Sequence, residues 1–211
     1  MSAETALREQ ICTIAASLYE RRLTHGSTGN ISARLPDGGW IMTPTGSSFG
    51  ALDPAKLSKL DETGRLISGD QPTKEAFLHT TMYEQRPSSG AVVHLHSTYS
   101  VAVSCRADVD CNDCLPPLTA YYVMRVGKLP IVPYFPPGDT ALAEAVGRLA
   151  GTHHAVLLAN HGPVVSGSTL AAATDAVEEL EETAKLFLLL EGRPLKPLTS
   201  EAVAELRQRF R

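Results

Sequence analysis

The sequence lacks any apolar run long enough to cross a membrane, because no stretch approaches the roughly 20 residues that a spanning helix needs. It also lacks an excess of positive charge, since the formal net charge of -4 provides no basic surface for nucleic acid. The first residues, Met1 to Thr5, show neither the basic nor the apolar region of a secretory signal. We therefore expect a cytoplasmic protein that binds neither membrane nor nucleic acid. A local cationic pocket can still hold a phosphorylated small molecule.

Cysteine is scarce as well, and its pattern favours free thiols. Two of the four cysteines, Cys111 and Cys114, form a C-x-x-C, which can be half of a zinc knuckle or a redox pair. No second C-x-x-C follows, and Pro116 and Pro117 indicate a loop instead of the helix that follows a thioredoxin-type motif. Unpaired thiols of this kind are typical of a reducing compartment.

Helical and strand-like segments are intermixed along all 211 residues. Apolar residues at helical spacing predict helices over residues 4–23, 71–86, 98–104, 140–150, 169–190 and 201–210, with a short helical turn over 52–60. Apolar, often β-branched runs predict strands over residues 31–34, 40–43, 66–68, 91–97, 121–124, 129–134, 154–162 and 164–166. A chain of this length can bury a core of its own, so we expect a single α/β domain over residues 1–211.

Two histidines in the run over residues 91–97 stand two positions apart. In a strand, side chains at i and i+2 point to the same face, so His94 and His96 would share one face while Val93 and Leu95 pack on the other. Two imidazoles held side by side provide half of a tetrahedral metal site. The same pair can also be core histidines bonded to carbonyl groups, and the pair alone does not decide between these interpretations.

A third imidazole would strengthen the metal interpretation, and His161 is the candidate. It stands at the end of a predicted buried strand, and Gly162 after it indicates a turn that exposes the side chain. Three histidines with an open fourth position are typical of a catalytic zinc site, whereas structural zinc sites are closed and rich in cysteine. The weaker candidates are the other histidines: His25, His79, His153 and His154.

Two turns rich in glycine and hydroxyl side chains indicate an anion site. They cover residues 25–32 and 43–48, and turns of this kind expose backbone N–H groups. An ordinary loop that enters a strand explains the first turn at least as well. Thr73 and Lys74 are expected in the first turn of a helix, where free N–H groups and the helix dipole attract anions. Glu75 in the same turn is also explained by simple helix electrostatics.

Taken together, these motifs resemble the class II aldolase and adducin family, typified by fuculose- and ribulose-phosphate enzymes. The resemblance runs in order over about residues 5 to 190. Within the family, the sequence is most similar to the 3-oxo-tetronate 4-phosphate decarboxylases. The resemblance to the family rests on five segments: Gly29-Asn30-Ile31-Ser32, Thr43-Pro44-Thr45-Gly46, Pro72-Thr73-Lys74-Glu75, His94-Leu95-His96 and Asn160-His161-Gly162.

This resemblance implies a three-layer α/β/α fold around a central, mainly antiparallel sheet, assembled as a homotetramer. It implies one zinc ion per subunit bound by His94, His96 and His161, although other divalent metals also bind histidine sites. Glu75 would be the acid/base at the open metal position. Aldolases of the family also use a tyrosine from a neighbouring subunit, which Tyr121 or Tyr122 could match. The implied phosphate and substrate ligands are Thr28, Gly29, Asn30, Thr45, Gly46, Thr73 and Lys74.

The implied reaction is decarboxylation of a 3-oxo-tetronate 4-phosphate to dihydroxyacetone phosphate and CO2. Zinc would stabilise the enediolate that forms, and Glu75 or a water that it holds would protonate C2. A class II sugar-phosphate aldolase makes the same enediolate by breaking a different bond, so an aldolase or epimerase is the alternative. Such aldolases usually carry two serines before the glutamate. In this sequence the two positions hold Thr73 and Lys74. The positive charge of Lys74 favours a more anionic substrate than that of an aldolase. A non-catalytic, adducin-like binding module would be expected to lack the metal ligands.

Overall fold

The computed structural model describes residues 2–136 and 138–210. These residues build one central sheet of eight strands in the order β4-β3-β2-β1-β5-β8-β7-β6. Neighbouring strands run antiparallel except for β6 and β7, which are parallel. The mainly antiparallel central sheet predicted from the sequence is therefore confirmed.

The strands are short, from two residues in β6 to six in β8. The run over residues 91–97 is predicted as one strand but is paired in β5 only as far as His94. The helical turn predicted over 52–60 ends early, because Ser58–Leu60 pairs with the neighbouring strand. The strand bounds are β1 Asn30–Arg34, β2 Trp40–Met42, β3 Ser58–Leu60, β4 Leu66–Ser68, β5 Ala91–His94, β6 Ile131–Val132, β7 Ala155–Leu158 and β8 Gly162–Gly167.

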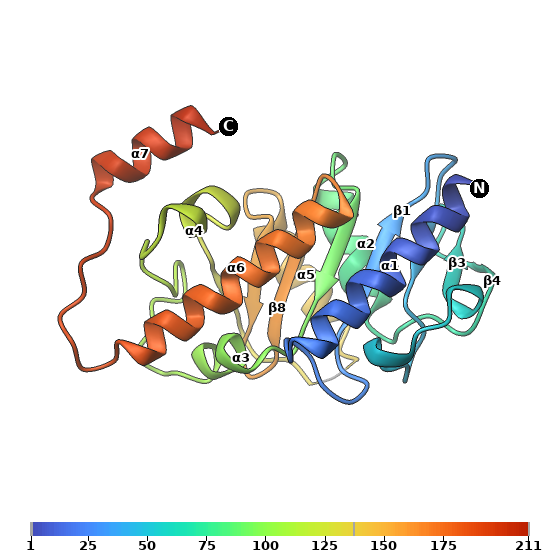
Figure 1. Cartoon of the computed structure of the whole chain (residues 1–211), viewed down its shortest axis with the longest axis horizontal. Coiled ribbons are helices and arrows are strands. Elements are labelled where there is room, and N and C mark those ends of the chain that lie inside the picture. The colour runs from blue at the N-terminus through green and yellow to red at the C-terminus, as the bar shows by residue number, and fades with distance from the viewer. Residues whose placement is uncertain (1, 137, 211) are drawn as a thin grey trace.

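Helices cover both faces of this sheet, and α1 and α6 lie across the same face in Figure 1. The last helix, α7, stands apart from the sheet and has no buried residue. In the described part of the chain, no helix is both long and apolar enough to span a membrane. The helix bounds are α1 Ala3–Glu20, α2 Ala76–Gln85, α3 Thr98–Ser104, α4 Ala120–Arg125, α5 Ala141–Ala150, α6 Leu170–Leu189 and α7 Ser200–Arg209, with 3₁₀ turns η1 Phe49–Ala51 and η2 Pro54–Lys56.

Side chains of β5 alternate between two buried layers. Val93 and Leu95 pack with Ile11 of α1 in the layer that also includes α6. Val92 packs on the opposite face with Leu78 of α2 in the layer that includes α5. Two helical layers therefore enclose the sheet, which confirms the predicted α/β/α arrangement. The alternation also confirms that Val93 and Leu95 point away from the face expected to carry the two histidines.

The strand predicted over residues 121–124 is wrong, because these residues belong to α4. The Thr119 hydroxyl accepts a hydrogen bond from the N–H of Tyr122 at 3.0 Å, which caps the start of a helix. Tyr122 and Val126, one helical turn apart, both pack into the core. Capping and packing therefore override the strand preference of this aromatic and β-branched stretch.

One acidic residue of α6, Glu181, has a role that its neighbours lack. It stands in the sequence among three other glutamates, Glu178, Glu179 and Glu182, but it is only 6% exposed. Its carboxylate accepts hydrogen bonds from the N–H groups of Tyr99 and Ser100, both at 2.8 Å, and from the Ser100 hydroxyl at 2.6 Å. It thereby satisfies the free N–H groups at the start of α3, the helix that follows the histidine strand.

We expect Glu181→Ala to destabilise the protein by about 1–3 kcal/mol, because it leaves these helix N–H groups without an acceptor. The matched control is Glu182→Ala, which removes only an exposed pair with Lys185 at 3.7 Å and should cost at most about 0.5 kcal/mol. Urea unfolding of the two variants and the wild type measures both values. Equal losses for the two variants would contradict the assigned role of Glu181.

Candidate active site

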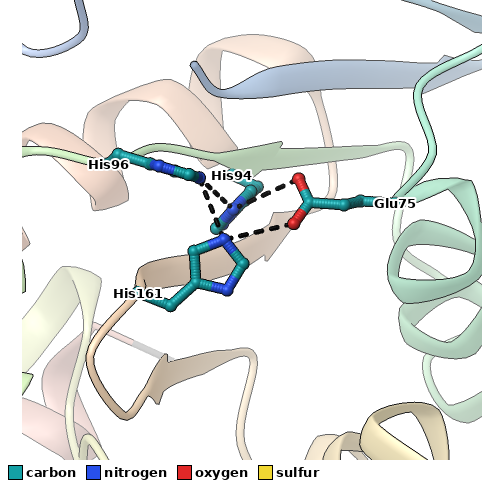
Figure 2. Close-up of side chains that lie close together, drawn as sticks. All are labelled: Glu75, His94, His96 and His161. Atoms are coloured by element: carbon teal, nitrogen blue, oxygen red, sulfur yellow. Dashed lines mark hydrogen bonds and ion pairs between the residues drawn. The ribbon is translucent and has the colours of Figure 1, made fainter. Parts of the chain in front are cut away.

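Three imidazoles and one carboxylate converge at one end of the sheet (Figure 2). His94 ends β5 and His96 follows it, while His161 lies in the turn between β7 and β8. Glu75 directly precedes α2. One possible ligand atom from each residue lies within 4.8 Å of the other three. Within the described residues, the remaining histidines lie outside this group: His25, His79, His153 and His154.

A glycine lets the start of β8 approach the segment that carries His96. A Cβ at Gly162 would lie 2.2 Å from the carbonyl oxygen of Leu95, which is closer than any side chain tolerates. Asn160 has a φ of 56°, a left-handed conformation that asparagine adopts more readily than most residues. The Asn-His-Gly sequence therefore forms a tight turn that sets His161 against His96.

The distances within this group fit a divalent metal. The Nε2 atoms of His94 and His161 each lie 3.0 Å from Nε2 of His96. Glu75 Oε1 lies 3.1 Å from Nε2 of His161. Four donors at about 2.0 Å from one zinc would be about 3.3 Å apart in a tetrahedron. His94 Nδ1 lies 2.8 Å from the Pro163 carbonyl, so Nδ1 carries the hydrogen and Nε2 presents its lone pair to the centre.

Burial controls the protonation of these ligands. It lowers the pKa of His96 to about 3, with a further contribution from His94. It lowers the pKa of His94 as well. Burial by itself would raise the pKa of Glu75, but His94, His161 and a hydrogen bond from Asn30 outweigh it, and the pKa lies below its ordinary value. At neutral pH, His94 and His96 are therefore neutral and Glu75 is ionised, which are the forms that bind metals.

A cavity of about 430 Å³ opens beside this group. Glu75, His96 and His161 form part of its wall. Ser27, which the sequence reasoning did not select, lines it too, and only its place in the first turn could have indicated this. All seven residues predicted to hold phosphate also line the cavity: Thr28, Gly29, Asn30, Thr45, Gly46, Thr73 and Lys74.

The prediction that Thr73 and Lys74 lie in the first turn of a helix is wrong, because α2 begins at Ala76. The N–H of Thr73 instead donates to the Thr43 carbonyl at 3.2 Å, and its hydroxyl accepts from the N–H of Glu75 at 3.2 Å. This stretch is therefore held against the continuation of β2. Both side chains still reach the cavity, but from a loop.

Two of the predicted phosphate ligands use their side chains elsewhere. The Thr28 hydroxyl donates to the His25 carbonyl at 2.6 Å, inside its own turn. The Asn30 amide nitrogen donates to Glu75 Oε2 at 2.7 Å, and its oxygen faces His79. Asn30 is therefore a partner of the carboxylate in this structure, and its side chain is not free to bind a phosphate.

The two candidate tyrosines differ sharply in exposure. Tyr122 is fully buried in the core, so it cannot reach a neighbouring subunit, and its candidacy is wrong. The position of Tyr122 in α4 explains its burial, because helical periodicity points its side chain toward the core. Tyr121 points the other way and is 58% exposed, which leaves it as a candidate.

A second cavity, of about 610 Å³, meets the first at His96 and His161. Its wall includes His25 and Asn160, together with apolar and aromatic side chains. Tyr134, which the sequence reasoning did not select, also lines this cavity and is 60% exposed. The imidazole group therefore lies between a cavity rich in hydroxyl groups and glycine and a larger one of mixed character.

This fold and histidine arrangement define a class of protein. The chain belongs to the class II aldolase and adducin family, because the profile of the Class II Aldolase and Adducin N-terminal domain matches residues 9–188. The family predicted from the five motifs is therefore confirmed.

Within this family, the chain is similar to several individual proteins. The 3-oxo-tetronate 4-phosphate decarboxylase of Escherichia coli O6:H1 is 50% identical over 204 residues, which cover 97% of this chain and 96% of the relative. The L-fuculose phosphate aldolase of Methanococcus maripaludis is 38% identical over 182 residues, which cover 86% and 94%. The crystal structure of YgbL from Escherichia coli has a TM-score of 0.95 at 48% identity and covers 98% of this chain and 100% of that one.

We expect the metal-free protein to lose stability as the pH falls from about 6.5. Burial lowers the pKa of His79 and His96 to about 3, so the unfolded chain takes up protons first and is favoured. Urea unfolding at pH 7.5 and pH 5.5 measures the loss. Equal free energies of unfolding at the two pH values would contradict these protonation states.

Proposed function

We propose that this protein is a metal-dependent decarboxylase that converts a 3-oxo-tetronate 4-phosphate to dihydroxyacetone phosphate and CO2. The observation that carries this proposal is the cavity in which Lys74 and two hydroxyl-rich turns share one wall with Glu75, His96 and His161. A substrate with phosphate at one end and a reactive carbonyl at the other matches such a wall. The 50% identity to a decarboxylase of this name supports the same choice.

Zinc is the metal that we assign to His94, His96 and His161. The neutral imidazoles of His94 and His96, the hydrogen bond that orients His94 and the open cavity beside the group all favour a catalytic site of this kind. When bound, zinc supplies a Lewis acid that draws electrons toward a substrate carbonyl oxygen. Everything else in the reaction is the work of side chains on this chain.

In the proposed reaction, Glu75 transfers the proton to the substrate. When the bond between C1 and C2 breaks, CO2 leaves and the electron pair passes into the neighbouring C3 carbonyl. C2 then needs a proton, which Glu75 delivers after taking it from water. Its carboxylate lies 3.1 Å from His161 Nε2 and 2.7 Å from the Asn30 amide, which orients it at the edge of the cavity.

Phosphate binding falls to the other part of the cavity wall. Gly29 and Gly46 both have positive φ, which lets the two turns bend close to an anion. Lys74 adds a positive charge to the wall that these turns share with Glu75. This charge distinguishes a substrate that carries both a carboxylate and a phosphate from one that carries phosphate alone.

A sugar-phosphate aldolase is the second candidate function. It is favoured by the 38% identity to an L-fuculose phosphate aldolase. The same ligand group and the same proton donor would serve its reaction, because both reactions draw electrons into a carbonyl next to the broken bond. Release of CO2 against release of an aldehyde separates the two candidates.

We also propose that the protein acts as a cytoplasmic homotetramer. Family resemblance supports this assembly, and so do exposed apolar side chains such as those of Tyr121, Leu189 and Phe210. The four cysteines are unpaired, which fits a reducing compartment. Tyr121 is the residue that we assign to a neighbouring site. Sedimentation of the purified protein measures the assembly.

Glu75→Gln should keep bound metal but lose turnover by about 10²–10⁴-fold, because the amide cannot transfer the proton. Metal content and CO2 release are measured on the same preparation. His96→Ala is the comparison variant and should lose metal and activity together. Near-normal turnover of Glu75→Gln would contradict the acid/base role.

Lys74→Ser should raise KM for the 3-oxo acid by about 10–100-fold, since a charge-assisted contact is lost. Lys56→Ser, an exposed lysine in η2, is the matched control and should leave KM unchanged. Inhibition by inorganic phosphate is measured in parallel. Equal weakening of phosphate and substrate would show that Lys74 binds phosphate only and does not select the acid.

A further inference from the structure

A line of hydrogen bonds continues from Glu75 into the interior between β1 and α2. The Asn30 amide nitrogen lies 2.7 Å from Glu75 Oε2, and the Asn30 oxygen faces His79 Nε2. His79 Nδ1 lies 2.7 Å from the Ser32 hydroxyl, which lies 2.8 Å from the Tyr83 hydroxyl. Five side chains from two neighbouring elements therefore form one continuous chain of contacts.

Two periodicities bring these residues together. Asn30 and Ser32 are two apart on β1, so their side chains share one face. Glu75, His79 and Tyr83 are spaced by four, so they follow one another along one side of α2 and its start. The strand and the helix thus present matching ladders of polar groups inside an otherwise apolar layer.

All the members behind Glu75 are buried. Asn30 is 3% exposed, Tyr83 is 1% exposed, and Ser32 and His79 are completely enclosed. Buried polar groups must find hydrogen-bond partners, and each of these four side chains finds them among the other members of the hydrogen-bonded line. Because the chain ends at Tyr83 in the core, it offers no route for protons from solvent. A positioning role therefore fits it better than proton transfer.

The direction of every bond in the chain follows from its first member. An ionised Glu75 can only accept, so Asn30 turns its NH2 group toward it and its oxygen toward His79. His79 Nε2 must then carry a hydrogen, and Nδ1 of the neutral ring accepts from the Ser32 hydroxyl. The Ser32 oxygen in turn accepts from the Tyr83 hydroxyl. Only one tautomer of His79 satisfies this order.

We propose that His79 is a positioning residue which, through Asn30, fixes the orientation of the Glu75 carboxylate at the metal group. This inference rests on the proposed function, in which Glu75 transfers the proton. It also gives Asn30 a role other than phosphate binding. Without the His79 donor, the Asn30 amide is free to rotate, and its oxygen can face the carboxylate and repel it.

The test compares His79→Phe with His79→Gln in the full-length, metal-loaded protein. Phenylalanine fills the space without a donor, whereas glutamine offers an NH2 group to Asn30 and a carbonyl to Ser32. His79→Phe should lower kcat about tenfold or more while KM and metal content stay unchanged, and His79→Gln should recover most of kcat. The matched control is His154→Phe, because His154 precedes β7 at the end of that strand away from His161. Its Nδ1 lies 3.0 Å from the Ser166 carbonyl. This variant should lose stability while keeping kcat.

Unchanged kcat in a folded, metal-loaded His79→Phe would overturn the proposal, and so would a His79→Gln variant as slow as His79→Phe. If His79→Phe does not fold, Ser32→Ala takes its place, since it removes the hydroxyl that donates to His79 Nδ1 and holds the ring with its Nε2 hydrogen toward Asn30. A normal kcat for Ser32→Ala would then overturn the proposal.

Crystal structures of the variants provide a readout that needs no turnover. The hydrogen bond between Asn30 and Glu75 should be lost in His79→Phe and kept in His79→Gln, and its retention in both would overturn the positioning role. A wild-type protein that releases no CO2 would contradict the proposed function alone.

Discussion

The rest of the site depends on one electrostatic constraint, the charge of Glu75 held beside three imidazoles, of which that of His94 is buried. A partly buried carboxylate is costly unless it is paired or hydrogen-bonded, and here His161 and Asn30 supply those contacts. Three strands at the centre of the sheet deliver the partners: β1 carries Asn30, β5 ends at His94, and β8 begins beside His161. The sheet order thus serves the site, because the strands nearest the ligand group are central and enclosed on both faces.

The same arrangement explains why this end of the sheet supports chemistry. Two cavities meet at the imidazoles, one lined by hydroxyl groups and glycines and one of mixed character. The two cavities together leave room for a substrate with unlike ends on either side of the imidazole group. Lys74 lies on the wall of the first cavity, where it adds charge without taking part in the ligand group. The polar ladder behind Glu75 carries this organisation one layer deeper into the core.

Local periodicity predicted much of this molecule. The period of two in β5 predicted which side chains face the core, and the Asn-His-Gly turn predicted the third imidazole of the group. What the sequence could not predict depends on partners distant in the chain. Glu181 is indistinguishable from its neighbours until Tyr99 and Ser100 lie against it. Asn30 looked like a phosphate ligand, because the sequence does not show that His79 takes its oxygen. The helix α2 begins later than predicted, at Ala76, because a hydrogen bond from Thr73 to the distant Thr43 holds the preceding residues in a loop.

The central claim is that this site breaks a bond to a carboxylate carbon. The most direct measurement follows a 3-oxo-tetronate 4-phosphate labelled with ¹³C at C1, mixed with the metal-loaded protein and observed by NMR. Our account predicts that the label appears in CO2 and bicarbonate while unlabelled dihydroxyacetone phosphate accumulates. Label that remains in an organic product, or appears in an aldehyde, would contradict it.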